Sequence, residues 1–570
     1  MIRPHLNYSI HIKNLYTYRD FLKKRPKHAH QFKFTMAKSQ QRMNQNDEKI
    51  VQLKLLRALK TFKSVPKVDF KDCIIEDYGF WKPRLLSAYK KISRVKTLVV
   101  VNPRTKSEIK DFKYFPQLKH IIYQLGGYYF ASQNYDRPNP ESERAHNYLK
   151  YLKYSPKVNS FNFADYSTWH FPKIGTKGRN RFKTLETLVL KKEKLIQNEF
   201  GFPIKLCKNL KSISFKFDDI RCSKSLTQMM EELPNLSNLQ EICMSFNKIS
   251  KFDFLSSFKS LAKKGILKKV KFDFGGGMLN LDEILDALEV CQLTHFSLKT
   301  FIKEGLFQSI AQFIQNMGNL ESFGLHIVNP VLFSNNQDII EICKQINKLQ
   351  ALQHLKLDFE TLTTGWKSAK ISNFIPYLSD VLLKTTKIET LHIGCLQLDP
   401  SETLQSLMPL LEDSADFLTH LRINLRALTC NKNTYRLILK FLQKLSNIQV
   451  LEIPCLGISG SSMQFFNEIA DKVYEAKFLR VLEIGRIRGA VNLSACYQTV
   501  ETISSKRGLR KFHCSLCYNF QRRLLKEGNV RYPNIKRIIE KNPYLGTLDI
   551  RNDFHCFRLD LEDWEKIYPR

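Results

Sequence analysis

Long apolar runs are missing from this 570-residue sequence. No run reaches the roughly 18 apolar residues that a membrane-spanning helix needs. The first residues contain no apolar stretch followed by a small-residue cleavage site, and the 13 cysteines fall at irregular intervals rather than in a disulfide framework. These absences predict an intracellular protein, cytoplasmic or nuclear, with free thiols. Met36 is an alternative start to Met1.

Familiar catalytic and metal-binding motifs are also absent. The sequence contains no GxSxG nucleophile elbow and no HExxH metal motif. Gly275–Gly277 lie between an expected strand and helix but lack the Lys and Ser/Thr of a phosphate loop. The single CxxC pair, Cys514 and Cys517, has no second pair, and Cys514 falls at a position expected to be buried. We therefore expect no enzyme activity, no cofactor and no metal site.

Acidic residues are scarce in the first third of the chain. The whole chain has a net charge of +36. Residues 1–200 hold 41 Lys and Arg against 16 Asp and Glu, whereas residues 301–500 hold 19 Lys and Arg against 18 Asp and Glu. A smaller basic excess runs from Lys506 to Lys541. Basic surfaces attract phosphate-rich polymers and acidic proteins, although an AT-rich genome would enrich lysine in the same way.

A short phrase, LxxLxL, recurs about sixteen times between Val95 and Ile550. It reads LETLVL at 185–190, LQHLKL at 352–357 and LRVLEI at 479–484, and its mean spacing is about 30 residues. A fixed period of this length is typical of a solenoid, in which each repeat covers only its neighbours.

Each repeat combines a short strand with a helix. Positions four to seven of the phrase alternate between apolar and polar residues, as in a half-buried strand. Stretches between the phrases have apolar residues at helical spacing, such as Ile284, Leu285, Leu288 and Val290. A strand–helix alternation without hairpin signals predicts parallel strands.

The pattern resembles the leucine-rich repeat family, and its repeat length is similar to that of the ribonuclease-inhibitor-like branch. The resemblance implies an α/β leucine-rich repeat solenoid, a curved horseshoe with parallel strands on the concave face and helices on the convex face. Four parts are expected: a basic, flexible arm over 1–45, a helical cap over 46–94, the solenoid over 95–550 with a loop or insertion at about 126–150, and a cap or tail over 551–570. The helix of the cap is predicted over 47–62.

The third, fifth and seventh positions of each phrase are expected to face the concave surface. Histidines recur there on five consecutive strands, but at staggered positions, so they cannot all meet at one metal ion. The candidate partner-binding residues on this face are Lys269, Lys271, His295, Lys299, His326, His354, Lys356, His392, His420 and Arg422.

The leading hypothesis is a non-catalytic scaffold that binds a protein partner through the concave face, because a preformed surface loses little entropy on binding. One alternative is a nucleic-acid-associated protein that contacts phosphates through its basic N-terminal third. Another is a substrate-recognition adaptor of a ubiquitin-ligase-type assembly. No membrane partner is expected.

Overall fold

The computed structural model describes twenty-odd segments of the chain, most of them between residues 157 and 516. They are 7–11, 31–35, 74–75, 97–101, 118–125, 157–165, 182–195, 204–220, 224–249, 254–275, 280–301, 305–328, 337–360, 374–379, 388–395, 400–425, 432–444, 447–454, 463–487, 493–516, 541–542, 545, 547–552 and 556–560. None of the helices in these segments is long and apolar enough to cross a membrane.

The chain divides into two compact units, Met1–Gly276 and Gly277–Arg570, here called unit 1 and unit 2. In unit 1 each strand pairs in parallel with the next one along the chain. Its strands are β1 (Asn7–His11), β2 (Gln31–Thr35), β3 (Ile74–Ile75), β4 (Thr97–Val101), β5 (His120–Leu125), β6 (Ser160–Asp165), β7 (Thr187–Leu195), β8 (Ser212–Ile220), β9 (Glu241–Ile249) and β10 (Lys269–Phe274).

Unit 2 repeats the same arrangement. Strands β11 to β19 are parallel neighbours, and β20 adds to β19 in the antiparallel direction. They are β11 (His295–Phe301), β12 (Ser322–Val328), β13 (His354–Glu360), β14 (Thr390–Cys395), β15 (His420–Leu425), β16 (Val450–Ile453), β17 (Val481–Ile487), β18 (Lys511–Leu516), β19 (Thr547–Asn552) and β20 (Cys556–Asp560).

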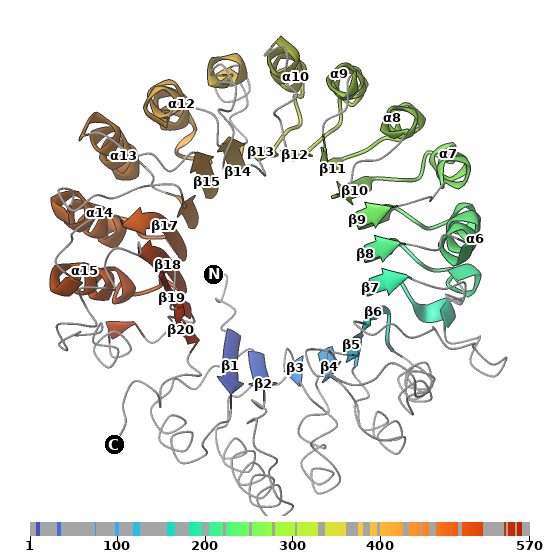
Figure 1. The fold of residues 1–570 in the computed structure, drawn as a ribbon, viewed down its shortest axis with the longest axis horizontal. Helices are drawn as coiled ribbons and strands as arrows, with labels where there is room; N and C mark the ends of the chain where they lie inside the picture. The colour runs from blue at the N-terminus through green and yellow to red at the C-terminus, as the bar shows by residue number, and fades with distance from the viewer. Residues whose placement is uncertain are drawn as a thin grey trace, which may run out of the picture. The chain divides into compact units, whose positions relative to one another are not determined.

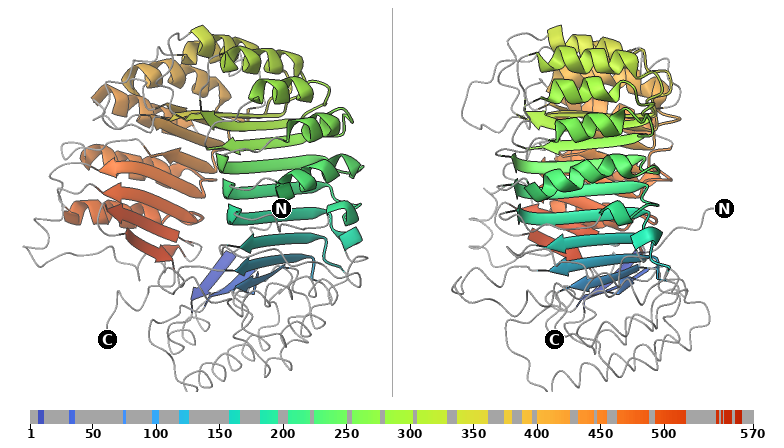
Figure 2. Two further views of the ribbon diagram at one scale, coloured as in Figure 1. Left: turned by 45° about the vertical axis from the view of Figure 1, so that its right-hand side comes forward. Right: turned by 90° about the vertical axis from the view of Figure 1, so that its right-hand side faces the viewer.

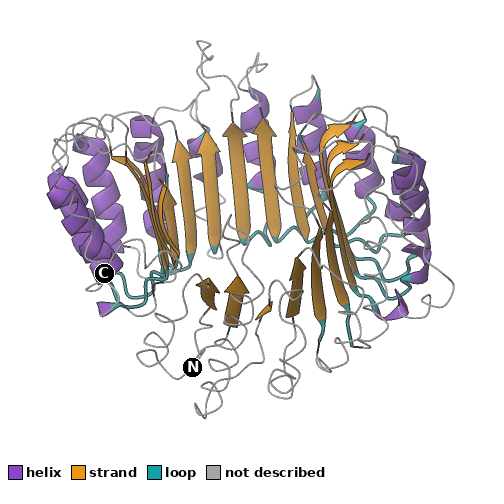
Figure 3. Cartoon of the chain, turned by 60° about the horizontal axis from the view of Figure 1, so that its bottom comes forward, coloured by secondary structure: helices purple, strands orange, loops and turns teal. Residues whose placement is uncertain are grey.

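Helices form a second layer along one side of the strands (Figures 1 and 3). Two turned views show neighbouring strands running side by side within each unit (Figure 2). Unit 1 holds η5 (Ile204–Leu206), α6 (Lys224–Glu232), η6 (Leu233–Asn235) and α7 (Leu255–Ala262). Unit 2 holds α8 (Leu281–Leu288), α9 (Leu306–Asn316), α10 (Gln337–Ile346), η8 (Ile375–Leu378), α12 (Pro400–Ser414), α13 (Lys432–Lys444), α14 (Met463–Glu475) and α15 (Leu493–Ser504).

The core lies between the two layers and is built by the repeated phrase. In β13, Leu355 and Leu357 are fully buried, as is Leu352 just before the strand. Strand β11 alternates without exception between buried and partly exposed residues. Because successive side chains of a strand point to opposite faces, one face of each strand meets the helices and the other remains polar. The predicted fold, an α/β solenoid of the leucine-rich repeat type with parallel strands, is confirmed.

Helix α8 is shorter than the sequence pattern predicts. Ile284, Leu285 and Leu288 are fully buried, as expected, but the helix ends at Leu288. Val290 lies in the following turn with 59% of its surface exposed. The sequence pattern placed Val290 on the buried face of the helix, but the chain has already left the helix at this residue, so its side chain does not face the core.

Phenylalanine takes the place of leucine along part of the core of unit 1. The ring of Phe246 stacks on Phe217, with centroids 6.0 Å apart and planes at 1°, and on Phe274, with centroids 5.9 Å apart. These residues occupy the eighth position of three successive phrases, one turn of the solenoid apart. The large rings fill the space between strand and helix layers where smaller side chains would leave a void.

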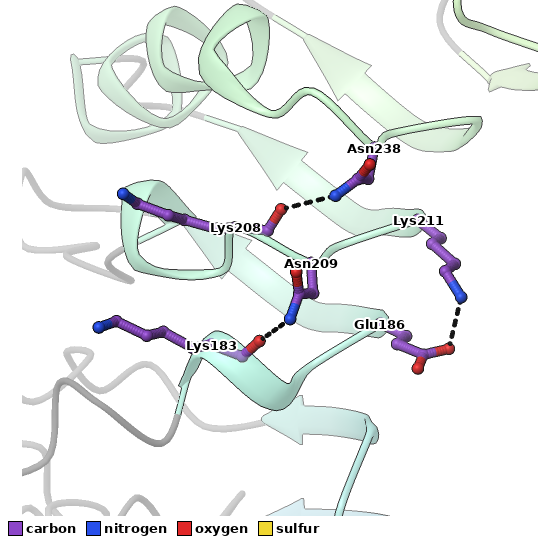
Figure 4. A network of polar contacts seen from close by, with 6 residues as sticks. All are labelled: Lys183, Glu186, Lys208, Asn209, Lys211 and Asn238. Carbon is purple, nitrogen blue, oxygen red and sulfur yellow. Dashed lines mark hydrogen bonds and ion pairs between the residues drawn. The ribbon is translucent and has the colours of Figure 1, made fainter.

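Asparagines immediately before the phrase tie neighbouring repeats together. Asn209 Nδ2 donates to the carbonyl of Lys183 at 2.7 Å, and Asn238 Nδ2 donates to the carbonyl of Lys208 at 3.2 Å (Figure 4). Asn447 makes the same contact with the carbonyl of Asp416 at 2.7 Å in unit 2. These side chains satisfy turn carbonyls that no helix or strand reaches.

The predicted division into arm, cap, solenoid and tail is only partly covered by the described residues. The helix predicted over 47–62 and the loop at about 126–150 lie outside them. Within 1–45 the described segments are the parallel strands β1 and β2, and within 551–570 β20 covers the edge of β19. The four-part division remains a prediction.

Candidate protein-binding surface

The polar face of the strands of unit 2 carries eight of the ten predicted residues. His295 and Lys299 lie on β11, His326 on β12, His354 and Lys356 on β13, His392 on β14, and His420 and Arg422 on β15. Register is uninterrupted across these strands, so that residues at the same phrase position form rows. We call the polar residues on this face of β12 to β16 the central strand face; they are Ser322, His326, His354, Lys356, Asp358, Thr390, His392, His420, Arg422, Asn424 and Glu452.

A carboxylate lies between two of the predicted histidines. Asp358 Oδ2 is 4.0 Å from His326 Nδ1 and 3.8 Å from His392 Nε2. All three side chains are mostly buried, with 13–15% of their surface exposed. Both distances exceed those of a hydrogen bond, so the carboxylate acts through its charge. Gly394, the neighbour of Asp358 on β14, leaves room for it, since a Cβ there would come within 2.9 Å of Asp358 Cγ.

His392 is neutral at neutral pH. Burial, together with the positive charges of Lys356 and Arg422 and the neighbouring ring of His326, lowers its pKa to about 3. Asp358 favours the protonated form, but at 3.8 Å it does not outweigh these effects. His392 Nε2 is buried and has no hydrogen-bond partner among the described residues. The cluster therefore holds one negative charge and at least one neutral ring.

Arg422 and Glu452 form an ion pair next to this cluster. Arg422 Nη1 donates to Glu452 Oε2 at 2.9 Å. Glu452 is 19% exposed and Arg422 is 38% exposed. Arg422 lies beside His392 in the same row, which carries Lys356, His392 and Arg422 on β13 to β15 and then the carboxylate of Glu452 on β16.

Threonine hydroxyls hold three more of the predicted histidines. His295 Nδ1 lies 2.9 Å from Thr294 Oγ1, His354 Nδ1 lies 3.1 Å from Thr390 Oγ1, and His420 Nδ1 lies 2.8 Å from Thr419 Oγ1. Burial and the charge of His354 lower the pKa of His420, while Glu389 and Glu452 raise it. These contacts fix the orientation of rings that would otherwise rotate in solvent.

Lys269 and Lys271 belong to unit 1 and are not part of this cluster. Both lie exposed on β10, and Lys269 Nζ is 3.3 Å from Glu241 Oε1 on β9. On β7 and β8 of the same unit, Lys191 and Lys216 are direct neighbours in register. Eight of the ten predicted residues thus belong to unit 2 and two to unit 1.

The carboxylates of the central strand face are absent from the predicted set. Asp358 occupies the seventh position of its phrase and Glu452 the fifth. Glu483 extends the row on β17, where its Oε1 lies 3.8 Å from His513 Nδ1 on β18. The third, fifth and seventh positions of the phrase, which identify the histidines, also identify these carboxylates, so they could have been predicted from the sequence.

No metal site is found among the described residues, and two of their thiols, those of Cys207 and Cys514, are buried. No group of three or more His, Cys, Asp or Glu side chains in these segments is arranged to hold a metal ion. Cys514 is fully buried, as its phrase position predicts. Burial, with a smaller effect of Glu232, raises the pKa of Cys207 to about 12, so this thiol stays protonated.

Comparisons with known proteins add little to this geometry. No family model matches the sequence. The chain is similar to a probable serine/threonine-protein kinase of Dictyostelium discoideum, with 28% identity over 159 residues, which cover 25% of this chain and 25% of the kinase. The chain therefore spans about a quarter of that protein.

Three solved structures show a distant likeness. A chain of the yeast Rad7–Elc1 complex aligns with 11% identity and a TM-score of 0.35, over 89% of this chain and 92% of that one. A chain of the TLR13–ssRNA13 complex aligns with 13% identity and a TM-score of 0.28, over 75% and 54%. The Drosophila Toll–Spatzle complex gives 12% identity and a TM-score of 0.23, over 90% and 64%. At these scores the likenesses carry no argument about function.

Proposed function

We propose that this chain is a non-catalytic scaffold whose central strand face binds a protein partner. The observation that carries the proposal is the pair of charged contacts on β12 to β16: Asp358 lies between His326 and His392, and Arg422 forms an ion pair with Glu452. Side chains fixed in this way lose little conformational entropy when a partner docks. Their pattern of opposite charges selects a complementary protein surface over a uniformly charged polymer.

The exposed members of this face are the expected contacts. Lys356 and His420 are exposed, and they stand beside partly buried Arg422 and His354. The buried charges then orient the exposed ones. The repeat length of about 30 residues, with full helices between strands, supports placing the solenoid in the ribonuclease-inhibitor-like branch of leucine-rich repeat folds.

The test is an affinity purification with two sets of variants. The tagged full chain is purified with and without nuclease, and the captured proteins are quantified. A variant carrying His354→Ala, Lys356→Ala, His420→Ala and Arg422→Ala is compared with a control carrying Lys344→Ala and Arg436→Ala, which are exposed on the helix layer. We expect a nuclease-resistant partner that the control keeps and the strand-face variant loses. Retention of every partner by the strand-face variant would show the assignment to be wrong.

Unit 1 supports a second candidate function, binding to nucleic acid. Lys191 and Lys216 lie side by side on β7 and β8, Lys269 and Lys271 lie exposed on β10, and residues 1–200 carry a large basic excess. Phosphate contacts make affinity fall steeply with salt. A salt titration of binding to single-stranded RNA distinguishes this candidate, because a flat response would exclude it. In the other predicted basic segment, Lys506 is 5% exposed and donates to the carbonyl of Tyr474 at 2.8 Å, so it contributes to packing.

The proposal retains two further predictions. An adaptor role in a ubiquitin-ligase-type assembly requires a helical adaptor-binding module ahead of the repeats. Residues 47–62, which are predicted to form a single helix, lie outside the described residues. An intracellular location is supported by cysteines such as Cys207, Cys243 and Cys343, which form no disulfide bond.

A further inference from the structure

A second surface of unit 2 lies at the edge where the strands begin. A groove of about 740 Å³ crosses four successive repeats at this edge. Four of its residues come immediately before β13, β14, β15 and β16, and the others lie in the turns that lead from helix to strand. We call it the rim groove; it is lined by Gln353, Glu389, Asp416, Phe417, Thr419, Asn447, Gln449 and Phe478.

The floor of the rim groove is held by a regular ladder of hydrogen bonds. The carbonyl of Glu389 accepts from the amides of Thr419 and His420 at 2.9 and 3.0 Å, and the carbonyl of Thr419 accepts from Gln449 and Val450 in the same way at 2.8 and 3.0 Å. Asn447 Nδ2 bonds the carbonyl of Asp416 at 2.7 Å. The groove is therefore preformed rather than a gap between moving loops.

Two phenyl rings lie in this groove with much of their surface in solvent. Phe417 is 46% exposed and Phe478 is 51% exposed. Most other phenylalanines of the described segments are buried in the core. Exposed aromatic rings lining a groove mark interaction sites more often than scattered apolar residues do.

The charge of the rim groove is opposite to that of the whole chain. Its lining includes two carboxylates, Glu389 and Asp416, and no Lys, Arg or His, although the chain has a net charge of +36. Lys477 and Arg480 flank Phe478 along the chain, so the acidic character is concentrated at the other end, around Phe417. A cation beside Phe417 gains both a carboxylate partner and the face of an aromatic ring.

From these features we infer that the rim groove binds an extended peptide segment of a partner protein, with an arginine or lysine next to an apolar residue. The basic side chain lies between Glu389, Asp416 and the ring of Phe417. The apolar residue covers Phe478, and the amides of Gln353 and Gln449 bond the peptide backbone. This site goes beyond the strand-face function, since it uses another edge of the repeats and another ligand chemistry.

Selection from random peptides tests the inference even though the partner is unidentified. Random nine-residue peptides displayed on phage are selected on the immobilised full chain, and recovered peptides are labelled and titrated by fluorescence anisotropy. Each is measured against wild type, Glu389→Gln with Asp416→Asn, and Phe417→Ala with Phe478→Ala. Tyr377→Ala is the matched control, because Tyr377 is 41% exposed elsewhere on unit 2. Thermal unfolding checks that each variant folds.

We expect recovered peptides to contain arginine or lysine, to bind wild type at least about tenfold tighter than either groove variant, and to bind Tyr377→Ala like wild type. When the basic residue of the peptide is changed to glutamine, wild type and the Glu389→Gln, Asp416→Asn variant should bind the peptide with the same affinity. Equal binding to wild type and both groove variants, or no enrichment of peptides at all, overturns the inference. A Lys356→Ala, Arg422→Ala variant, which keeps His420 and its bond to Thr419, retains its peptide affinity in this account, so failure here is separate from failure of the strand-face proposal.

Discussion

The carboxylate of Asp358 lies against the backbone of Gly394 on the next strand. A Cβ built on Gly394 would come within 2.9 Å of Asp358 Cγ and closer still to Oδ1. The absence of a side chain at 394 thus positions the carboxylate between His326 and His392. Relationships of this kind link one repeat to the next and define the surface that we propose to be functional.

Gly394→Ala is expected to destabilise unit 2 by about 1–2 kcal/mol, because the new methyl group displaces the Asp358 carboxylate. In an Asp358→Ala background the same change should be neutral or slightly stabilising, since alanine restricts the unfolded chain. Chemical denaturation of the four proteins of this cycle gives the coupling. Gly318→Ala, which meets nothing within 4 Å, is the control. Equal effects in both backgrounds would contradict the account.

His392 should make the protein less stable as the pH falls. Its folded pKa is about 3, against an ordinary value of 6.5, so the unfolded chain binds the proton more tightly. Its contribution is fully present above about pH 6.5 and is lost progressively between there and pH 3, at up to about 1.4 kcal/mol per pH unit. His420, whose pKa is also lowered, acts in the same direction. Denaturation of wild type and His392→Gln between pH 7 and 5 measures this slope, which the variant should reduce; an unchanged slope would show that His392 titrates normally.

The pair of Arg422 and Glu452 should show a coupling free energy of about 0.5–1 kcal/mol in a double-mutant cycle to alanine. The pair is only partly exposed and its hydrogen bond is 2.9 Å long. The control is the ion pair of Lys472 with Glu475, whose Nζ and Oε2 atoms are also 2.9 Å apart but whose carboxylate is 65% exposed. We expect a smaller coupling there. A coupling no larger at Arg422 than at Lys472 would mean that the strand-face pair is not preorganised.

The asparagine contacts between repeats should differ in strength according to burial. Asn542 is 1% exposed and donates to the carbonyls of Ser504 at 3.0 Å and Leu509 at 2.8 Å. Asn542→Ala leaves two buried carbonyls without these donors and should cost about 2–3 kcal/mol. Asn447→Ala removes a single hydrogen bond, which is more exposed to solvent than those of Asn542, and should cost about 1 kcal/mol. Unfolding free energies of the two variants check this order, and a reversed order would contradict it.

The repeated phrase is strong enough to predict the fold without a structure. Leu355 and Leu357 alternate with polar residues because one face of β13 is buried, and the same pattern returns every 30 residues or so. Local periodicity also predicts which residues share the polar face, since strand geometry leaves two choices for each side chain. Val290 shows the limit of this rule, because the end of a helix depends on the turn that follows.

Contacts between repeats could not be predicted in the same way. The approach of Asp358 to His392 depends on strand register and on the missing side chain of Gly394, 36 residues away. The rim groove includes Phe417 and Phe478, which both come immediately before a phrase but two repeats apart. Asn447 occupies that position in the repeat between them, so the phrase alone does not indicate that the two rings line one groove. The bond of Asn447 to Asp416 likewise joins residues 31 positions apart.

The most direct test of the central claim is the dissociation constant of a purified protein partner, recovered in the nuclease-treated purification, measured against two forms of this chain. The account predicts that the strand-face variant, with His354, Lys356, His420 and Arg422 changed to alanine, binds at least about 100-fold more weakly than wild type, as expected when several central contacts are lost. The control with Lys344→Ala and Arg436→Ala should bind like wild type. The same dissociation constant for wild type and the strand-face variant would contradict the claim that the central strand face binds the partner.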